Sequence, residues 1–385
     1  MLLTAATVVS GTELHQPGWL EIDGPDVIAI GAGIPTRKAD LELGNAVVVP
    51  GFVDIHVHGG GGGAFPAGDP DQARTAVRLH RRHGTTTTIG SLVTASPTDL
   101  LDQVAVLADL TEEGVLAGSH LEGPWLSPRQ GGAHDLTQLR DPDPVELADV
   151  FAASRGTIRM VTVAPELPGA LDAISRIVDA GAVAAVGHTD ATYEQARSAI
   201  DRGATVATHL FNAMRPVHHR EPGPVLALLE DQRVTVELIT DGVHLHPALY
   251  RDVAHVTGPD RVALVTDAMA AAGMADGAYR LGTLDVTVTD GVARLTGATT
   301  IAGSTATMDQ VFRYAVRHSA LPFLDAVLAA ARQTSVNPAA ALALPRVGTL
   351  KPGSFADLVV LDEELATRGV MRRGTWIHSP TERSR

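Results

Sequence analysis

Short apolar runs alternate with longer helical stretches through most of this chain, and no other feature limits its fold as strongly. β-Branched and apolar residues dominate the short runs, and Ala, Leu and charged residues fill the stretches between them. This alternation predicts βαβ units and a parallel sheet. The candidate strands lie at about residues 47–55, 85–93, 115–121, 158–164, 183–187, 205–208, 234–240 and 262–266. Eight βα units over roughly 250 to 290 residues match a closed (β/α)₈ barrel, whereas a doubly wound sheet, the alternative, needs fewer strands.

Both ends of the chain hold short apolar runs separated by Gly, Pro and Asp, which is typical of β-strands joined by tight turns. Neither end can bury a two-sided core alone. We therefore expect residues 1–48 and 344–385 to form one small β-sandwich domain, with a catalytic barrel over residues 49–343. At about 279–300, Asp290-Gly291 between two apolar runs indicates a β-hairpin inserted before the last barrel helix.

The composition of the chain argues against nucleic-acid and membrane partners and against sites that need cysteine. The 385 residues carry a formal net charge of −14, which is unsuited to following a nucleic-acid backbone. The absence of Cys excludes disulfides and thiolate metal sites. The apolar N-terminus is short and lacks the basic flank of a signal peptide, and no apolar run is long enough for a membrane span. We expect a cytoplasmic protein without nucleic-acid or membrane partners.

Polar side chains directly follow five of the eight candidate strands. In (β/α)₈ barrels, the carboxyl ends of the strands carry the chemistry. The first strand ends His56-Val57-His58, and strand alternation places both imidazoles on one face. The residues expected to converge are four histidines and two carboxylates: His56, His58, Glu122, His188, His209 and Asp267.

This set of residues predicts a metal site. Imidazole and carboxylate together suit zinc, iron, manganese or cobalt better than calcium or magnesium. Six ligands can hold one or two ions, with a carboxylate as bridge. A carboxylated-lysine bridge is excluded because Lys38 and Lys351, the only lysines, lie outside the barrel; Glu122 is the natural replacement. A single His after a strand is more often structural, as we expect for His120, but five coincident strand ends argue against that interpretation here.

Several motifs resemble those of known enzymes. Residues 50–58 are similar to the opening motif of the amidohydrolase superfamily, and residues 348–358 to its closing strand. Within that superfamily, an ordered set of motifs between about residues 46 and 362 resembles the N-acetylglucosamine-6-phosphate deacetylase family. These motifs are residues 120–125, 187–189, 208–214, 241–244 and 266–269.

The resemblance implies hydrolysis of the acetamide of N-acetylglucosamine 6-phosphate to glucosamine 6-phosphate and acetate. It implies that Glu122, His188 and His209 hold the metal always present in the family. The presence of both His56 and His58 implies a second ion, shared with Glu122 and Asp267. The resemblance also implies a homodimer in which Arg220 reaches the substrate phosphate in the neighbouring subunit's site.

The residue types suggest a mechanism. Asp267 is placed to act as general base and then general acid. His134, in the glycine-rich loop of residues 130–134, is the candidate for stabilising the oxyanion. A phosphate needs positive charge, and residues 218–220 form the one suitable basic cluster near the site. The resemblance implies sugar or phosphate contacts for Asn212, Ala213 and His244. The other substrate-binding candidates are Ala133, His134, His219, Arg220, Ile301, Ala302 and Gly303.

Three other functions remain possible. A different amidohydrolase, such as a deaminase or dipeptidase, would use the same metal face. A non-catalytic barrel scaffold would be expected to lose ligands, and here all six are present. A metal-free phosphate-binding barrel synthase would not need the His-X-His strand end.

Overall fold

The predicted (β/α)₈ barrel is confirmed in the computed structural model of the chain, which describes residues 1–380. Eight strands form one sheet in which strand order follows chain order. They are β8 (Phe52–Val57), β11 (Thr85–Leu92), β12 (Gly118–Glu122), β13 (Ile158–Val163), β14 (Val183–Val186), β15 (Ala204–Ala207), β16 (Thr235–Ile239) and β17 (Val262–Val265). The order never reverses, as it would in a doubly wound sheet. The chain segments after β17 and in β8 are joined by hydrogen bonds from Asp267 N–H to the His56 carbonyl (2.9 Å) and from His58 N–H to the Ala268 carbonyl (2.7 Å).

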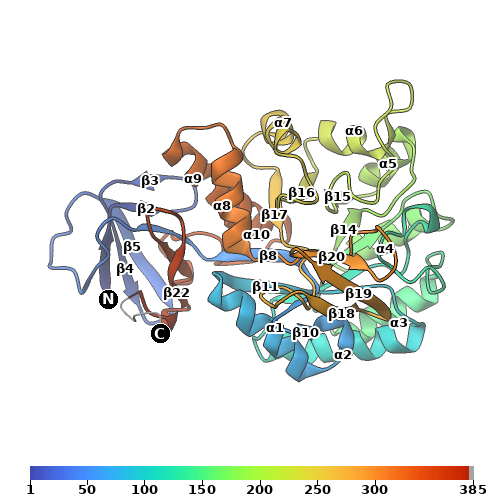
Figure 1. Cartoon of the computed structure of the whole chain (residues 1–385), viewed down its shortest axis with the longest axis horizontal. Coiled ribbons are helices and arrows are strands. Elements are labelled where there is room, and N and C mark those ends of the chain that lie inside the picture. Colours follow the sequence, from blue (N-terminus) through green and yellow to red (C-terminus); the bar gives the residue numbers. More distant parts are fainter. Residues whose placement is uncertain (381–385) are drawn as a thin grey trace. The chain divides into compact units, whose positions relative to one another are not determined.

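Helices follow the barrel strands in turn (Figure 1). They are α1 (Pro70–Arg82), α2 (Pro97–Glu112), α3 (Pro144–Ser154), α4 (Ala170–Asp179), α5 (Tyr193–Asp201), α6 (Gly223–Glu230), α7 (Pro247–Thr257) and α8 (Met308–His318), with α9 (Phe323–Ala331) and α10 (Asn337–Ala341) after them. Local sequence explains several starts. Ser96 and Asp143 accept hydrogen bonds from first-turn amides of α2 and α3, and Thr192 forms a capping box with Gln195 at α5.

Two strands differ from the sequence prediction by more than one residue at a boundary. The expected strand at 47–55 is divided at Gly51 into β7 (Val47–Pro50), which joins an end sheet, and β8. A Cβ at Gly51 would lie 2.2 Å from Thr86 Oγ1, so only glycine allows this close passage. The strand expected at 115–121 begins at Gly118, because the amides of Val115 and Leu116 still bond to the Leu110 carbonyl at the end of α2.

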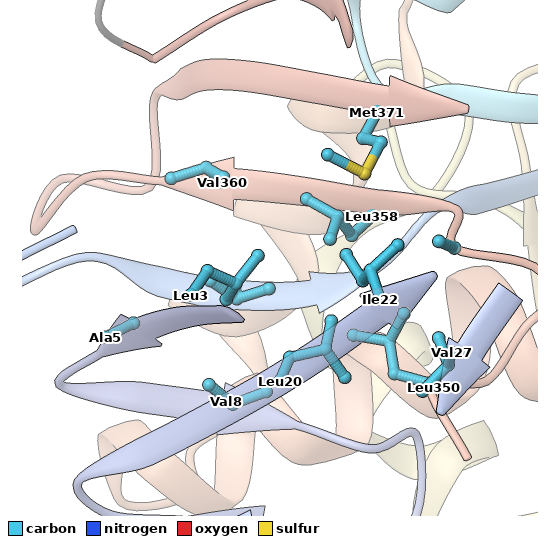
Figure 2. Close-up of a cluster of buried hydrophobic side chains, with 12 residues drawn as sticks. Leu3, Ala5, Val8, Leu20, Ile22, Val27, Leu350, Leu358, Val360 and Met371 are labelled. Carbon is cyan, nitrogen blue, oxygen red and sulfur yellow. The ribbon is translucent and has the colours of Figure 1, made fainter. Parts of the chain in front are cut away.

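The strands of the two chain ends form two sheets that share a core. The four-stranded sheet contains β1 (Leu2–Ala5), β4 (Gly18–Asp23), β5 (Asp26–Ala32) and β6 (Leu41–Glu42). The six-stranded sheet contains β7 together with β2 (Thr7–Val9), β3 (Leu14–His15), β21 (Leu358–Leu361), β22 (Thr367–Arg372) and β23 (Thr375–His378). Leu3, Leu20 and Ile22 of the first sheet pack with Leu358 and Met371 of the second (Figure 2).

The chain divides into two compact units. One contains Met1–Asp54, His80–Thr87 and Thr307–Arg385, and the other contains Ile55–Leu79 and Thr88–Ala306. Of the small domain that the sequence predicts at 1–48 and 344–385, residues 381–385 lie outside the described part of the chain. Within residues 1–380, no helix has the length and apolar character needed to cross a membrane.

A small antiparallel sheet follows β17. It contains β18 (Gly277–Leu281), β19 (Leu284–Thr289) and β20 (Val292–Leu295), and a two-stranded ribbon, β9 (Gly59–Gly60) with β10 (Gly63–Ala64), follows β8. Asp290 and Gly291 link β19 to β20 with φ values of 51° and 72°, as a tight hairpin turn requires. Sequence reasoning missed β18, whose Leu281 packs with Val286 in a local core.

Candidate metal centre

The six side chains expected at the barrel mouth lie together in the unit made of Ile55–Leu79 and Thr88–Ala306. His56 lies in β8 and Glu122 ends β12. His58 follows its strand directly, and the other three residues come two positions after their strands end. Three of these residues, His188, His209 and Asp267, have positive φ values of 45°, 25° and 48°. Left-handed backbone at a non-glycine residue costs about 1–3 kcal/mol and persists where the surroundings enforce it, commonly at functional sites.

The first group of potential ligand atoms centres on the His-X-His pair. His58 Nε2 lies 3.1 Å from Glu122 Oε2 and 3.2 Å from Asp267 Oδ1. His56 Nε2 lies 3.5 Å from the same Asp267 oxygen and 3.4 Å from Glu122 Oε1. Atoms bound tetrahedrally at about 2.0–2.2 Å from one ion lie roughly 3.3–3.6 Å apart. These four buried side chains therefore have spacings close to those of ligands to a single ion.

The second group shares the same glutamate. Glu122 Oε1 lies 2.8 Å from His209 Nε2 and 3.1 Å from His188 Nε2. The two histidine nitrogens are themselves 3.1 Å apart. Glu122 thus faces both groups, with one oxygen near His188 and His209 and the other near His58, which is the arrangement needed for a bridging carboxylate.

The second ring nitrogens of His58 and His188 have partners that suit metal-binding rings. Nδ1 of His58 faces the Ser91 carbonyl at 3.2 Å, and Nδ1 of His188 faces the Gln130 carbonyl at 2.8 Å. A carbonyl can only accept, so Nδ1 carries the proton and the Nε2 lone pair of the neutral ring faces the cluster. Ligating histidines in proteins commonly have this arrangement.

His134 has the opposite orientation. Its Nδ1 accepts a hydrogen bond from the Thr94 amide at 3.3 Å and lies 2.9 Å from the Thr94 hydroxyl. The proton of the neutral ring therefore lies on Nε2, which is 3.4 Å from Glu122 Oε2. Burial lowers the pKa of His134 to about 4, so the ring is neutral at ordinary pH. His134 thus presents an N–H donor, rather than a lone pair, to the cluster.

The carboxylates of the cluster are held ionised. Burial opposes ionisation of Asp267, but the charge of His56 and the hydrogen bond from His58 outweigh it and lower the pKa of the Asp267 carboxyl. Glu122 has its pKa lowered further, because His56 and His188 outweigh the cost of burial. Both groups can therefore accept a proton or bind a cation near neutral pH.

The comparisons with known proteins agree with this geometry. The family model described as "Amidohydrolase family" matches residues 47–377.

The chain belongs to the amidohydrolase family.

Among the relatives of this amidohydrolase, N-acetylgalactosamine-6-phosphate deacetylase from Escherichia coli O157:H7 is 36% identical over 94% of this chain and 96% of the relative. N-acetylglucosamine-6-phosphate deacetylase from Lysinibacillus sphaericus is 32% identical over 97% of each chain. A mutant N-acetyl-D-glucosamine-6-phosphate deacetylase from Mycobacterium smegmatis, solved in complex with N-acetyl-D-glucosamine-6-phosphate, is 60% identical, with a TM-score of 0.98 over 98% of this chain and 99% of that one.

The buried His120 has a hydroxyl partner at each ring nitrogen. Thr162 on β13 places its hydroxyl 2.9 Å from Nε2 of the buried His120. Ser91 Oγ lies 3.0 Å from the other ring nitrogen, Nδ1. His120 therefore has both ring nitrogens paired by hydroxyl groups beneath the site, as expected of a structural residue.

A cavity of about 370 Å³ opens over the cluster. Most of the predicted substrate-binding residues line it: Ala133, His134, Asn212, Ala213, His244, Ile301 and Gly303. Three do not. Ala302 is buried in a local hydrophobic core, and its N–H bonds to the Ala293 carbonyl. His219 and Arg220 are exposed, and neither lines this cavity.

Sequence reasoning missed two charged residues. Arg129 lines the cavity and is the only Lys or Arg to do so in the described part of the chain. It precedes the predicted glycine-rich loop by one residue, and that position was the available signal. Glu237 on β16 is fully buried, with Oε2 3.1 Å from His56 Nδ1. Its signal was a carboxylate within the apolar run Val236–Ile239 of a predicted barrel strand.

Proposed function

We propose that this amidohydrolase removes acetate from N-acetyl-D-glucosamine 6-phosphate, leaving D-glucosamine 6-phosphate. The observation that carries the proposal is the 60% identical enzyme solved with that sugar phosphate, which matches this chain with a TM-score of 0.98. The cavity supports it, because a metal-capable cluster, a neutral N–H donor and an ionised aspartate meet there. Its volume of about 370 Å³ is within the range of small-molecule sites.

The ligand set supports zinc in one or two positions per subunit. Glu122, His188 and His209 would hold the first ion. His56, His58 and Asp267, with Glu122 as bridge, would hold the second. Bound there, a divalent metal supplies a water of lowered pKa and polarises the acetamide carbonyl.

The protein side chains account for the proton movements. Asp267 accepts a proton as the water oxygen bonds to the acetamide carbon, and returns it to the nitrogen as the C–N bond breaks. His134 donates its Nε2–H to the carbonyl oxygen, where negative charge develops. The products are acetate and the free amine, so one water is consumed.

Polar groups around the cavity suit the sugar and its phosphate. His244 Nδ1 donates to Asp241 Oδ2 at 2.7 Å. Burial opposes the charge on His244, but Asp241 outweighs it and raises the pKa of the imidazole. We assign sugar or phosphate contacts to His244, Asn212 and Ala213, and backbone contacts to Ala133, Ile301 and Gly303, which line the cavity.

The exposed residues His219 and Arg220 support a homodimer, because a cationic side chain outside its own cavity can serve a neighbouring one. In this arrangement Arg220 reaches the phosphate bound in the other subunit. A charged sugar phosphate crosses membranes poorly, which supports a cytoplasmic enzyme.

The alternative reactions have less support. Both relatives described above are deacetylases by name, so a deaminase, a dipeptidase or a non-catalytic scaffold is not favoured. The one specific competitor is the C4 epimer of the sugar, because a 36% identical relative is named for N-acetylgalactosamine 6-phosphate.

The deciding experiment measures acetate release from three sugars, with the protein loaded with metal and after chelation. The sugars are N-acetylglucosamine 6-phosphate, its galactose epimer and unphosphorylated N-acetylglucosamine. We expect metal-dependent release with the highest kcat/KM for the first. Higher kcat/KM for the epimer would reassign the substrate, and no release from any of the three with metal restored would refute the deacetylase assignment.

A further inference from the structure

Glu237 is a carboxylate placed deep in the barrel. It lies on β16 between Val236 and Leu238, and its exposed fraction is 0%. Strand alternation gives Glu237 and Ile239 the same face, and Ile239 lines the cavity whereas Glu237 does not. Glu237 therefore lies one side-chain layer deeper in the barrel than Ile239 and the cavity wall. At that depth it cannot touch a substrate, but it can touch the side chains that hold a metal.

The Glu237 carboxylate connects the two groups of ligands. Its Oε2 lies 3.1 Å from His56 Nδ1 and accepts a hydrogen bond from the His209 backbone amide at 3.2 Å. The Glu237 carbonyl also accepts from the Leu210 amide at 2.9 Å. His56 belongs to the group with His58 and Asp267, and His209 to the group with Glu122 and His188. One side chain thus fixes a residue in each group.

Three histidines of the two ligand groups have an Nδ1 that faces an acceptor, and of these His56 is the one whose acceptor is a carboxylate. The partners of His58 and His188 are backbone carbonyls. A hydrogen bond to an ionised acceptor is about twice as strong as a neutral one. It holds the imidazole in the tautomer with a free Nε2 lone pair and makes that nitrogen a better electron donor to a cation.

Structural stability alone does not explain this residue. Glu237 Oε1 is buried and has no hydrogen-bond partner among residues 1–380. A buried acceptor left unpaired costs about 1–3 kcal/mol, and an apolar residue on this strand would avoid that cost. A carboxylate at this position is explained if it orients the side chains that would hold the metal.

We propose that Glu237 is a positioning residue of the metal centre that sets the affinity for the ion held by His56 and His58. It acts through Nδ1 of His56, and through the His209 amide it aligns the second group with the first. The inference rests on the proposed metal dependence of the enzyme, and it concerns metal binding rather than the choice of substrate.

The test is a metal titration of chelator-stripped, full-length Glu237→Gln. Gln preserves the shape of the side chain and removes its charge. Zinc content by mass spectrometry and competition with a chromophoric chelator would give the stoichiometry and affinity. We expect one ion to bind about 10- to 100-fold more weakly than in the wild-type protein, while the other changes less. Cobalt(II) absorption spectra would report the coordination geometry independently. At the same cobalt concentration, we expect Glu237→Gln to lose the absorption band of the more weakly bound ion, which the wild-type protein retains.

Asp309→Asn is the matched control. Asp309 is a buried carboxylate whose Oδ1 lies 3.2 Å from His83 Nδ1, in the other compact unit. This variant removes the same kind of pair and should leave zinc stoichiometry and affinity unchanged. Glu237→Asp, which keeps the charge but withdraws it by one methylene, should bind zinc with intermediate affinity and provides the measurement if the Gln variant does not fold.

Wild-type affinity for both ions in Glu237→Gln, or in a folded Glu237→Asp when the Gln variant does not fold, would overturn the inference. Equal weakening in Asp309→Asn would do the same, because the effect would then be general destabilisation. The titrations contain no substrate. A wild-type protein that binds two ions but releases no acetate would refute the proposed function and leave the role of Glu237 to be decided by the variants.

Discussion

Thr94 determines which nitrogen His134 presents to the active site. The amide of Thr94 donates to His134 Nδ1 at 3.3 Å, and its hydroxyl lies 2.9 Å from the same atom. An imidazole that accepts at Nδ1 must donate at Nε2 while it is neutral. Since the pKa of His134 is lowered to about 4, the neutral form is maintained through the physiological range.

This relationship predicts that His134 acts in the transition state rather than as a ligand. His134→Ala should lower kcat about 10²- to 10³-fold, the usual cost of losing one oxyanion donor, with little change in bound zinc. Thr94→Val should lower kcat less, because the backbone N–H remains. Steady-state kinetics beside metal analysis would test this. If zinc is lost in proportion to activity, His134 is a ligand and the assignment is wrong.

Arg129 predicts a phosphate contact within the same subunit. Its side chain is 80% exposed, and its guanidinium pairs with Asp190 Oδ2 at 3.1 Å. Asp190 also accepts two hydrogen bonds from Arg215, at 3.2 and 3.1 Å. Asp190 is thus already neutralised, and Arg129 contributes a positive charge at the rim of the cavity.

We expect Arg129→Ala to raise KM for the phosphorylated sugar about three- to tenfold, which corresponds to roughly 1 kcal/mol for an exposed ion pair. The kcat/KM for unphosphorylated N-acetylglucosamine should not change. Arg129→Lys should be intermediate. Arg202→Ala, an exposed arginine that does not line the cavity, is the control. An equal loss with both sugars would show that Arg129 shapes the loop rather than binds phosphate.

The protonation state of His58 predicts that metal binding releases a proton. Burial lowers the pKa of this imidazole, but hydrogen bonds to Asp267 and Glu122 outweigh it and raise the pKa to about 9 in the metal-free protein. The pKa of His58 in the folded protein is thus above its value of about 6.5 in the unfolded chain. Its contribution to stability is therefore complete below that value and is lost as the pH rises through about 9.

A metal must displace this proton. Burial opposes the charge on His56, but Glu122 and Glu237 outweigh it and raise the pKa of this imidazole as well. Apparent zinc affinity at the His56/His58 position should therefore rise at least about tenfold per pH unit between pH 7 and 9. Calorimetry at pH 7 in buffers of different ionisation enthalpy should find about two protons released for this ion, one from each imidazole. The metal-free protein should melt at a lower temperature at pH 9.5 than at pH 7. Zinc binding without proton release at pH 7 would contradict the assigned charge state.

The sequence predicted which polar side chains meet at the barrel mouth better than it predicted their surroundings, for a physical reason. The carboxyl ends of parallel strands must meet at one end of a barrel, so a polar residue just after each apolar run could be placed without a structure. The hydrogen-bond partners of those residues could not be placed from the sequence. Glu237 faces His56 although β16 and β8 are not paired with each other, and the contact depends on strand register. The direction of His134 depends on a Thr94 amide 40 residues away.

The role of Arg220 can be tested by mixing two inactive variants. Asp267→Asn removes the general base, with an expected loss of about 10²- to 10⁴-fold, and Arg220→Ala removes the proposed phosphate contact. If Arg220 acts across a dimer, a heterodimer has one site lacking both groups and one site with Asp267 and a partner Arg220 intact. Co-expression should then restore up to half the wild-type activity per dimer at low substrate concentration.

The opposite geometry gives a different result. If Arg220 serves its own subunit, every site in the heterodimer lacks one group, and mixing yields only the average of the two variants. Arg202→Ala in place of Arg220→Ala controls for subunit exchange, because half of the heterodimer's sites then retain Asp267 whichever subunit supplies Arg220. The experiment applies only if sedimentation shows that the wild-type protein is a dimer. A fully active monomer would exclude the action of Arg220 between subunits, because each cavity would then work with the residues of its own chain.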